Sequence, residues 1–136
     1  MRRGSERDHV TGLDTRGTLA AFLSMNRRPL AAAICDVVGL KSVNDRDGFL
    51  AGDDCLRQAA DRLRSAAGDA AILARLGGDE LLAVYVGVTA AAAADRTAAL
   101  LRGPGTPPLR AAAGGLGVDE SPDALVERLY ATLRQS

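Results

Sequence analysis

Three carboxylates are placed where two predicted strands end or begin. Asp36 directly follows the apolar run 30–35. Asp79 and Glu80 lie in a glycine-rich turn that precedes the apolar run 81–86. If these strands are neighbours in one sheet, the three side chains crowd one edge, and a hard divalent cation such as Mg²⁺ relieves their mutual repulsion. The turn is equally explained by hairpin geometry, because Gly-Gly-Asp is a good turn sequence, so spacing alone leaves both interpretations open.

The two residues before the acidic pair are Gly77 and Gly78. Because glycine has no side chain, a ligand can approach the backbone of such a turn closely. Mg²⁺ in proteins is commonly held by one or two carboxylates together with the phosphate groups of a substrate. The metal interpretation of this segment therefore implies a phosphate-bearing substrate.

The elements that must position these residues follow from the hydrophobic pattern. Apolar residues at helical spacing predict four helices, over 15–28, 53–67 and 89–101 and from 121 onward. Apolar runs predict four strands, over 30–35, 70–76, 81–86 and 109–118. This order, with a hairpin between the second and third strands, favours an α/β (α+β) two-layer sandwich with a mainly antiparallel central sheet flanked by helices.

Two segments are expected to be irregular because they contain glycines. Residues 37–51 are predicted to form a loop with one turn of helix at 41–44. Gly114 and Gly115 are expected to break the strand 109–118, since glycine weakens the interior of a strand.

Length, charge and composition exclude several classes of protein. The 136 residues suit one domain, and the 17 basic and 17 acidic side chains cancel, so no overall field favours nucleic acid or an anionic membrane. No apolar run approaches the roughly 20 residues that cross a bilayer, and no apolar segment follows the basic residues of the start, as it would in a secretory signal. Cys35, Cys55 and the single His9 form neither a disulfide framework nor a zinc pattern. We therefore expect a cytoplasmic protein.

Four segments resemble, in order, the motifs of GGDEF domains, the family of diguanylate cyclases. Residues 8–16 resemble the D-x-L-T-G-L-x-N-R motif, and residues 36–45 resemble D-x-D-x-F-K-x-I-N-D. Residues 48–53 resemble G-H-x-x-G-D, and residues 74–81 match A-R-x-G-G-D-E-F. One such motif is weak evidence, but four at the family's spacing are specific. The resemblance implies one GGDEF-like domain over 8–136, preceded by an N-terminal extension, 1–7.

The resemblance also implies a fold like the palm of nucleotidyl cyclases and polymerases, and an activity in bacterial second-messenger signalling. A diguanylate cyclase condenses two GTP molecules into cyclic di-GMP and releases two pyrophosphates. Each protomer of an antiparallel homodimer holds one GTP. Such domains are commonly attached to an upstream sensory module, and we expect one to be a partner here.

The family's metal and catalytic positions fall on the acidic residues already noted. By motif position Asp36 and Asp79 would hold Mg²⁺ (or Mn²⁺), with help from the Val37 carbonyl. Glu80 would be a further metal ligand or would help to activate the 3′-hydroxyl of GTP. The resemblance therefore makes Asp79 and Glu80 the catalytic pair.

The family's substrate-binding positions are also present. By motif position Asn44 and Asp53 would bind the guanine edge, and Lys41, the single lysine, would contact phosphate. The remaining positions lie on the backbone near the substrate, at Gly39, Leu40, Gly77 and Gly78. Taken one at a time, Asn44 could be a turn residue, Asp53 a helix cap and Lys41 a solvated side chain.

The chain departs from the family at an inhibitory site and at four motif positions where it carries a different, apolar residue. The R-x-x-D motif that binds product in many members is replaced by Gly68 and Ala71, so we expect no feedback through that site. The apolar replacements are Val38, Leu40, Phe49 and Leu81.

The C-terminal segment departs more seriously. Family members end with a segment whose Lys and Arg side chains bind the triphosphate of GTP. With Tyr130 aligned to the family tyrosine, Leu133 takes the Lys position and Arg134 lies one residue away. Charge-assisted contacts contribute about 1.5–3 kcal/mol each. Losing two would weaken triphosphate binding by about two to four decades.

These observations leave three hypotheses. The first is a diguanylate cyclase, weak and free of R-x-x-D feedback. The second is a degenerate GGDEF domain that binds GTP or a protein partner as a sensor or scaffold without turnover. The third, more remote, is another palm-type nucleotidyl cyclase or polymerase relative.

Overall fold

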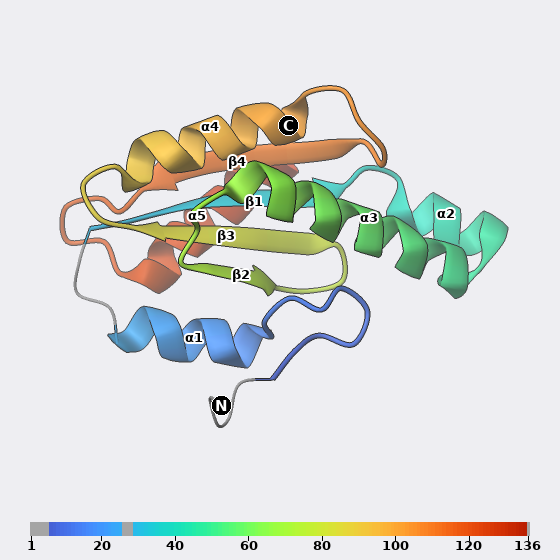
Figure 1. The fold of residues 1–136 in the computed structure, drawn as a ribbon, viewed down its shortest axis with the longest axis horizontal. Coiled ribbons are helices and arrows are strands. Elements are labelled where there is room, and N and C mark those ends of the chain that lie inside the picture. The colour runs from blue at the N-terminus through green and yellow to red at the C-terminus, as the bar shows by residue number, and fades with distance from the viewer. Residues whose placement is uncertain (1–5, 26–28, 136) are drawn as a thin grey trace.

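The computed structural model describes residues 6–25 and 29–135, which fold as a sheet with helices packed on both sides (Figure 1). The strands are β1 (Leu30–Val37), β2 (Ile72–Arg75), β3 (Glu80–Val86) and β4 (Leu109–Gly115). The helices are α1 (Arg16–Met25), α2 (Leu40–Asp47), α3 (Phe49–Ala67), α4 (Ala90–Arg102) and α5 (Pro122–Arg134).

The four strands pair antiparallel in the order β2-β3-β1-β4, which confirms the predicted fold class. β1 is central and every residue in it is buried, as its unbroken apolar run predicts. None of the helices within the described ranges is both long enough and apolar enough to span a membrane.

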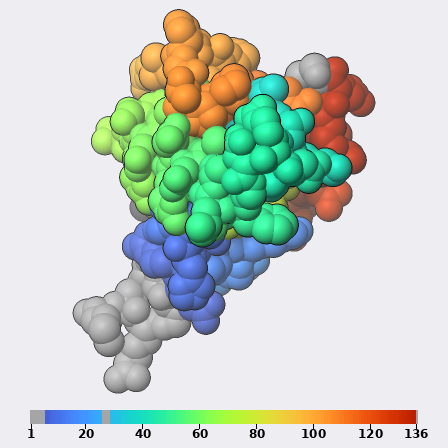
Figure 2. Space-filling view, turned by 90° about the vertical axis from the view of Figure 1, so that its right-hand side faces the viewer, coloured from blue at the N-terminus to red at the C-terminus, as the bar shows by residue number. Residues whose placement is uncertain are grey.

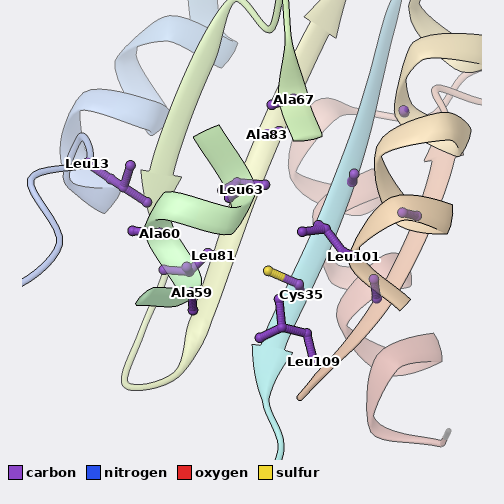
Figure 3. Packing of buried hydrophobic residues seen from close by; sticks show 14 of the residues in the cluster. Leu13, Cys35, Ala59, Ala60, Leu63, Ala67, Leu81, Ala83, Leu101 and Leu109 are labelled. Carbon is purple, nitrogen blue, oxygen red and sulfur yellow. The ribbon is translucent and has the colours of Figure 1, made fainter. Parts of the chain in front are cut away.

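Alternate residues of β1 face two separate hydrophobic layers. Ala31, Ala33 and Cys35 point toward α3 and α4, and Figure 3 shows Cys35 among the leucines and alanines of that layer. Leu30, Ala32 and Ile34 point toward α1 and α5. Because most of the β1 side chains are small, helices pack closely on both faces of the sheet.

The prediction of a loop over 37–51 was wrong, because most of that segment is helical. α2 occupies Leu40–Asp47, and α3 begins at Phe49 rather than at Asp53. Gly39 (φ 76°) and Gly48 (φ 89°) supply the turns that flank α2, in a region of φ that disfavours other residues. The helix escaped prediction because its sequence, LKSVNDRD, has almost no apolar stripe.

The prediction that Gly114 and Gly115 break the last strand was also wrong. Both continue β4 and pair with Ala32 and Ala31 of β1. A Cβ on Gly114 would stand 3.3 Å from side-chain atoms of Arg128 and Leu129, so glycine here allows α5 to approach the strand.

The helices α2 and α3 meet at Gly52 and Asn44. Gly52 is buried, and a Cβ at this position would stand 1.7 Å from Oδ1 of Asn44. The absence of a side chain on Gly52 therefore creates the space that the Asn44 amide occupies.

We expect Gly52→Ala to move the Asn44 side chain while leaving the fold nearly as stable as before. By helix propensity alone, alanine within a helix is favoured over glycine by about 1 kcal/mol. Forcing Asn44 from its rotamer costs about 0.5–1.5 kcal/mol in the opposite direction. Chemical denaturation should give a net change below about 1 kcal/mol, and the NMR signals of the Asn44 side-chain amide should shift. Unchanged signals would contradict the close packing.

Candidate active site

The acidic edge lies where β1 ends. Asp36 is the penultimate residue of β1, and its Cα partners are Glu80 on β3 and Arg110 on β4. Cross-strand partners project from the same face of a sheet, so the three side chains lie side by side. Asp36 is only 4% exposed, which makes it one of the few buried charged residues among those described.

Arg110 binds both carboxylate oxygens of Asp36. Its Nε donates to Oδ1 at 3.0 Å and its Nη2 donates to Oδ2 at 2.5 Å. These bonds raise the pKa of Arg110, so the guanidinium remains charged. A bidentate pair of this kind is among the stronger polar interactions in proteins. The sequence analysis missed Arg110, although it is the one charged residue in the strand LRAAAGG.

The acidic surroundings of Glu80 favour its protonated form. Its pKa is raised to about 7, first by a hydrogen bond with Asp79, then by burial and by the charges of Asp79 and Asp36. A Cβ on Gly77 would stand 2.8 Å from Oε1 of Glu80, so this glycine makes room for the Glu80 side chain. Close to neutral pH Glu80 is therefore able both to hold and to release a proton.

The possible metal ligands are of the chemical type that a hard divalent cation prefers, but they are not arranged around one point. Carboxylates and a backbone carbonyl, as offered by Asp36, Val37, Asp79 and Glu80, are the ligands that Mg²⁺ prefers. Within 6–25 and 29–135 no group of three or more His, Cys, Asp or Glu side chains is arranged to hold a metal ion. At Asp36, both carboxylate oxygens accept a hydrogen bond from Arg110.

Arg75, on β2, holds the turn that carries the acidic pair. Its Nη2 donates to the carbonyl of Gly78 at 2.7 Å and its Nε donates to the carbonyl of Gly77 at 3.1 Å. Its Nη1 also donates to both carboxylate oxygens of Asp8, at 3.1 and 3.2 Å. Arg75 thus ties the N-terminal motif to the turn, a role that its place in the A-R-x-G-G-D-E-F motif could have suggested.

Asp8 is itself fixed by its neighbours. Its Oδ2 accepts from the backbone nitrogen and the hydroxyl of Thr11, both at 2.8 Å. Burial alone would raise the pKa of Asp8, but the bonds from Thr11 and Arg75 outweigh it and lower the pKa. Asp8 is therefore an anion that stabilises the Arg75 guanidinium beneath the turn.

The predicted guanine-binding residues lie on the α2–α3 pair, beyond the end of β1. Figure 1 shows these helices extending past that end of the sheet, and Figure 2 shows them at the centre of the corresponding face. Asn44 and Asp53 are both half-buried, on either side of the α2–α3 contact. The structure places Asn44 against Gly52, the residue before Asp53, near the start of α3.

The predicted phosphate-binding residues lie between β1 and α2. Gly39 precedes α2 in a left-handed conformation. Leu40 is buried in the core, so only its backbone could meet a ligand. Lys41 has a side chain that is 92% exposed, and its Nζ lies 3.5 Å from Oδ2 of Asp45. This exposed pair contributes little to stability, which leaves Lys41 able to move toward an anion.

The two residues at the C-terminal clamp position differ in their surroundings. Leu133 is fully buried in the layer formed with α1 and the sheet. Arg134 is exposed, and its guanidinium carbon lies 4.5 Å from the centre of the Tyr130 ring, a cation–π contact. Leu133 therefore serves the core, whereas Arg134 remains at the surface.

The class of protein follows from comparison with known families. Residues 5–107 match the family model described as diguanylate cyclase, GGDEF domain. This match covers most of the chain, and the chain belongs to the GGDEF domain family.

Individual relatives agree with this assignment. Diguanylate cyclase TpbB of Pseudomonas aeruginosa (strain UCBPP-PA14) is 36% identical over 98 residues, which cover 67% of this chain and 22% of TpbB. The uncharacterized protein Rv1354c of Mycobacterium tuberculosis is 34% identical over 107 residues, which cover 75% of this chain and 17% of that protein. A crystal structure of a sensory box/GGDEF family protein from Caulobacter crescentus CB15 is similar with a TM-score of 0.71 and 30% identity, covering 96% of this chain and 97% of that one. The chain thus spans between about a tenth and a fifth of the length of the curated relatives it matches.

We expect Arg75→Met to destabilise the protein by about 2 kcal/mol, because it removes charge-assisted bonds to Asp8 and to the turn. Denaturant unfolding measures the loss, and a double-mutant cycle with Asp8→Asn should give a coupling of about 1 kcal/mol. Arg57→Met is the matched control, since Arg57 pairs with Asp54 on the exposed side of α3. It should cost less than about 0.5 kcal/mol. Equal losses in the two variants would contradict the role of Arg75.

We expect Glu80→Gln to stabilise the protein more at pH 8 than at pH 5. The folded-state pKa of about 7 exceeds the ordinary value of 4.5, so the neutral form of Glu80 is favoured by folding. That contribution is complete below pH 4.5 and is lost as the pH rises to 7. Glutamine imitates the neutral form at every pH. Unfolding free energies of both proteins across this range test the expectation, and a difference that does not change with pH would contradict it.

Proposed function

We propose that this domain is a diguanylate cyclase that condenses two GTP molecules into cyclic di-GMP and two pyrophosphates. The observation that carries the proposal is the row of Asp36 and Glu80 on adjacent strands, with Asp79 next to Glu80 in the chain. In a chain of the GGDEF family this row is the expected site of phosphodiester formation.

The reaction joins two nucleotides held by two copies of the chain. The 3′-oxygen of one GTP attacks the α-phosphorus of the other, a phosphodiester bond forms, and the bond from the α-phosphorus to the β-phosphate oxygen breaks. Pyrophosphate leaves with that oxygen, and the same step with the roles exchanged closes the ring. A homodimer is therefore part of the proposal, because each GTP must supply both an attacking hydroxyl and an α-phosphate.

The residues of this chain would bind and orient the nucleotide. Asn44 and Asp53 would hydrogen-bond the guanine edge, which rejects adenine because a buried polar group is then left without its partner. Lys41 and the backbone at Gly39 would meet the phosphates. Ionised Glu80 would accept the proton of the 3′-hydroxyl, a task for which a pKa of about 7 is well suited.

A divalent cation, Mg²⁺ or Mn²⁺, would be held by Asp36, Asp79, Glu80 and the Val37 carbonyl. When bound it neutralises the triphosphate and the charge that develops on the leaving group.

A second candidate function is GTP or partner-protein binding without turnover. Two specific observations favour it. Arg110 occupies the oxygens of Asp36, and buried Leu133 stands where the family carries a phosphate-binding lysine. Both would reduce the affinity for a metal–triphosphate complex.

The two candidates are separated by incubating the protein with GTP and Mg²⁺ or Mn²⁺ and measuring cyclic di-GMP by mass spectrometry. We expect product from GTP and none from ATP. Asp79→Ala should reduce the rate at least about 100-fold, because it removes a metal ligand from the reacting centre. Asp95→Ala, on the exposed side of α4, is the matched control and should leave the rate unchanged. Binding of GTP without product would support the second candidate instead.

A further inference from the structure

Arg110 stands in a position where a charged side chain is unexpected. It lies on β4, an edge strand whose other residues are Leu, Ala and Gly. Its guanidinium reaches the end of the central strand β1 and hydrogen-bonds to Asp36, a residue 74 positions away in the chain. The side chain of Arg110 is 37% exposed, whereas that of Asp36 is 5% exposed. The pair is therefore open to solvent on the arginine side alone.

This geometry sets arginine and a divalent cation in competition. Both Asp36 oxygens accept a hydrogen bond from Arg110, one from Nε and one from Nη2. A hard cation binds through the same oxygens. Since Asp36 is buried, water does not readily replace either partner, and two adjacent cations repel each other strongly where solvent screening is weak.

The surrounding charges strengthen the hold of Arg110. The carboxylate of Asp79 also attracts the guanidinium, in addition to the bonds from Asp36. Arg110 thus neutralises part of the negative charge that would otherwise attract a metal ion to this edge of the sheet. No second cation is needed to relieve the repulsion between the acidic side chains.

We propose that Arg110 is a built-in counter-cation that occupies the metal-binding oxygens of Asp36, so that a divalent cation binds this domain only by displacing the guanidinium. The proposal rests on the proposed function in one respect, the assignment of Asp36 as a metal ligand. It makes Arg110 the residue that determines the metal affinity of the site.

The test is direct titration with Mn²⁺, in which electron paramagnetic resonance counts the free ion and no nucleotide is present. Arg110→Gln keeps a hydrogen-bond donor but removes the charge, and it should bind Mn²⁺ at least about tenfold more tightly than the unaltered chain, which corresponds to about 1.4 kcal/mol. Arg128→Gln is the matched control. Arg128, in α5, forms a similar two-bond pair with Glu120, which lies just before that helix. The Arg128→Gln variant should bind Mn²⁺ as the unaltered chain does.

Three results would overturn the proposal in this titration. The first is equal affinity in the Arg110→Gln variant and the unaltered chain. The second is an equal gain in the Arg128→Gln variant, which would indicate only a change in net charge. The third is a gain that persists when Asp36→Asn is added to Arg110→Gln, which would place the ion elsewhere.

A second measurement on the unaltered chain does not depend on whether the variants fold. The Arg110 Nε–H group gives an NMR signal whose position depends on its bond to Asp36. Saturating Mg²⁺ should shift that signal as the guanidinium leaves, and Mg²⁺ bound at the acidic residues with the signal unchanged would overturn the proposal. Neither measurement uses GTP turnover. A chain that makes no cyclic di-GMP can still bind Mn²⁺ more tightly when Arg110 is replaced, so the two proposals fail separately.

Discussion

The antiparallel register of β1 with its two neighbours is the constraint on which the site depends. It sets Asp36 opposite Glu80 on one side and opposite Arg110 on the other. A shift of β1 by one residue would turn Asp36 to the opposite face of the sheet from Glu80 and Arg110. The register is held by the core, because small residues on both faces of β1 pack against two separate layers of helices.

Around this row the chain uses arginine to hold backbone and carboxylate groups in place. Arg75 joins the acidic turn to Asp8, and Arg62 donates to the carbonyls of Leu101 and Pro107, which fixes the loop before β4. The planar guanidinium presents several donors in fixed directions, so one side chain can link segments that are far apart in sequence. The positions of Asp36 and Glu80 therefore depend on contacts well outside the site.

Much of the fold was predictable because its signals are local. The buried strand at Leu30–Val37, the hairpin of β2 and β3, and the amphipathic stripe of α3 each follow from residues close together in sequence. The errors came where tertiary packing overrides local preference. Gly114 remains in β4 because α5 packs against it, Gly115 faces Ala91 of α4, and α2 forms although its sequence has almost no apolar stripe.

The amino-acid sequence was enough to identify the family and to single out the acidic residues and the glycine-rich turn, because short motifs with fixed spacing carry them. The partners of each acidic group became known only from the folded chain. Asp36 could have been free to hold a cation, but the fold brings Arg110 from 74 positions away onto both of its oxygens. Contacts of this kind depend on strand order and register, which are set by the packing of the whole core, and no local pattern encodes them.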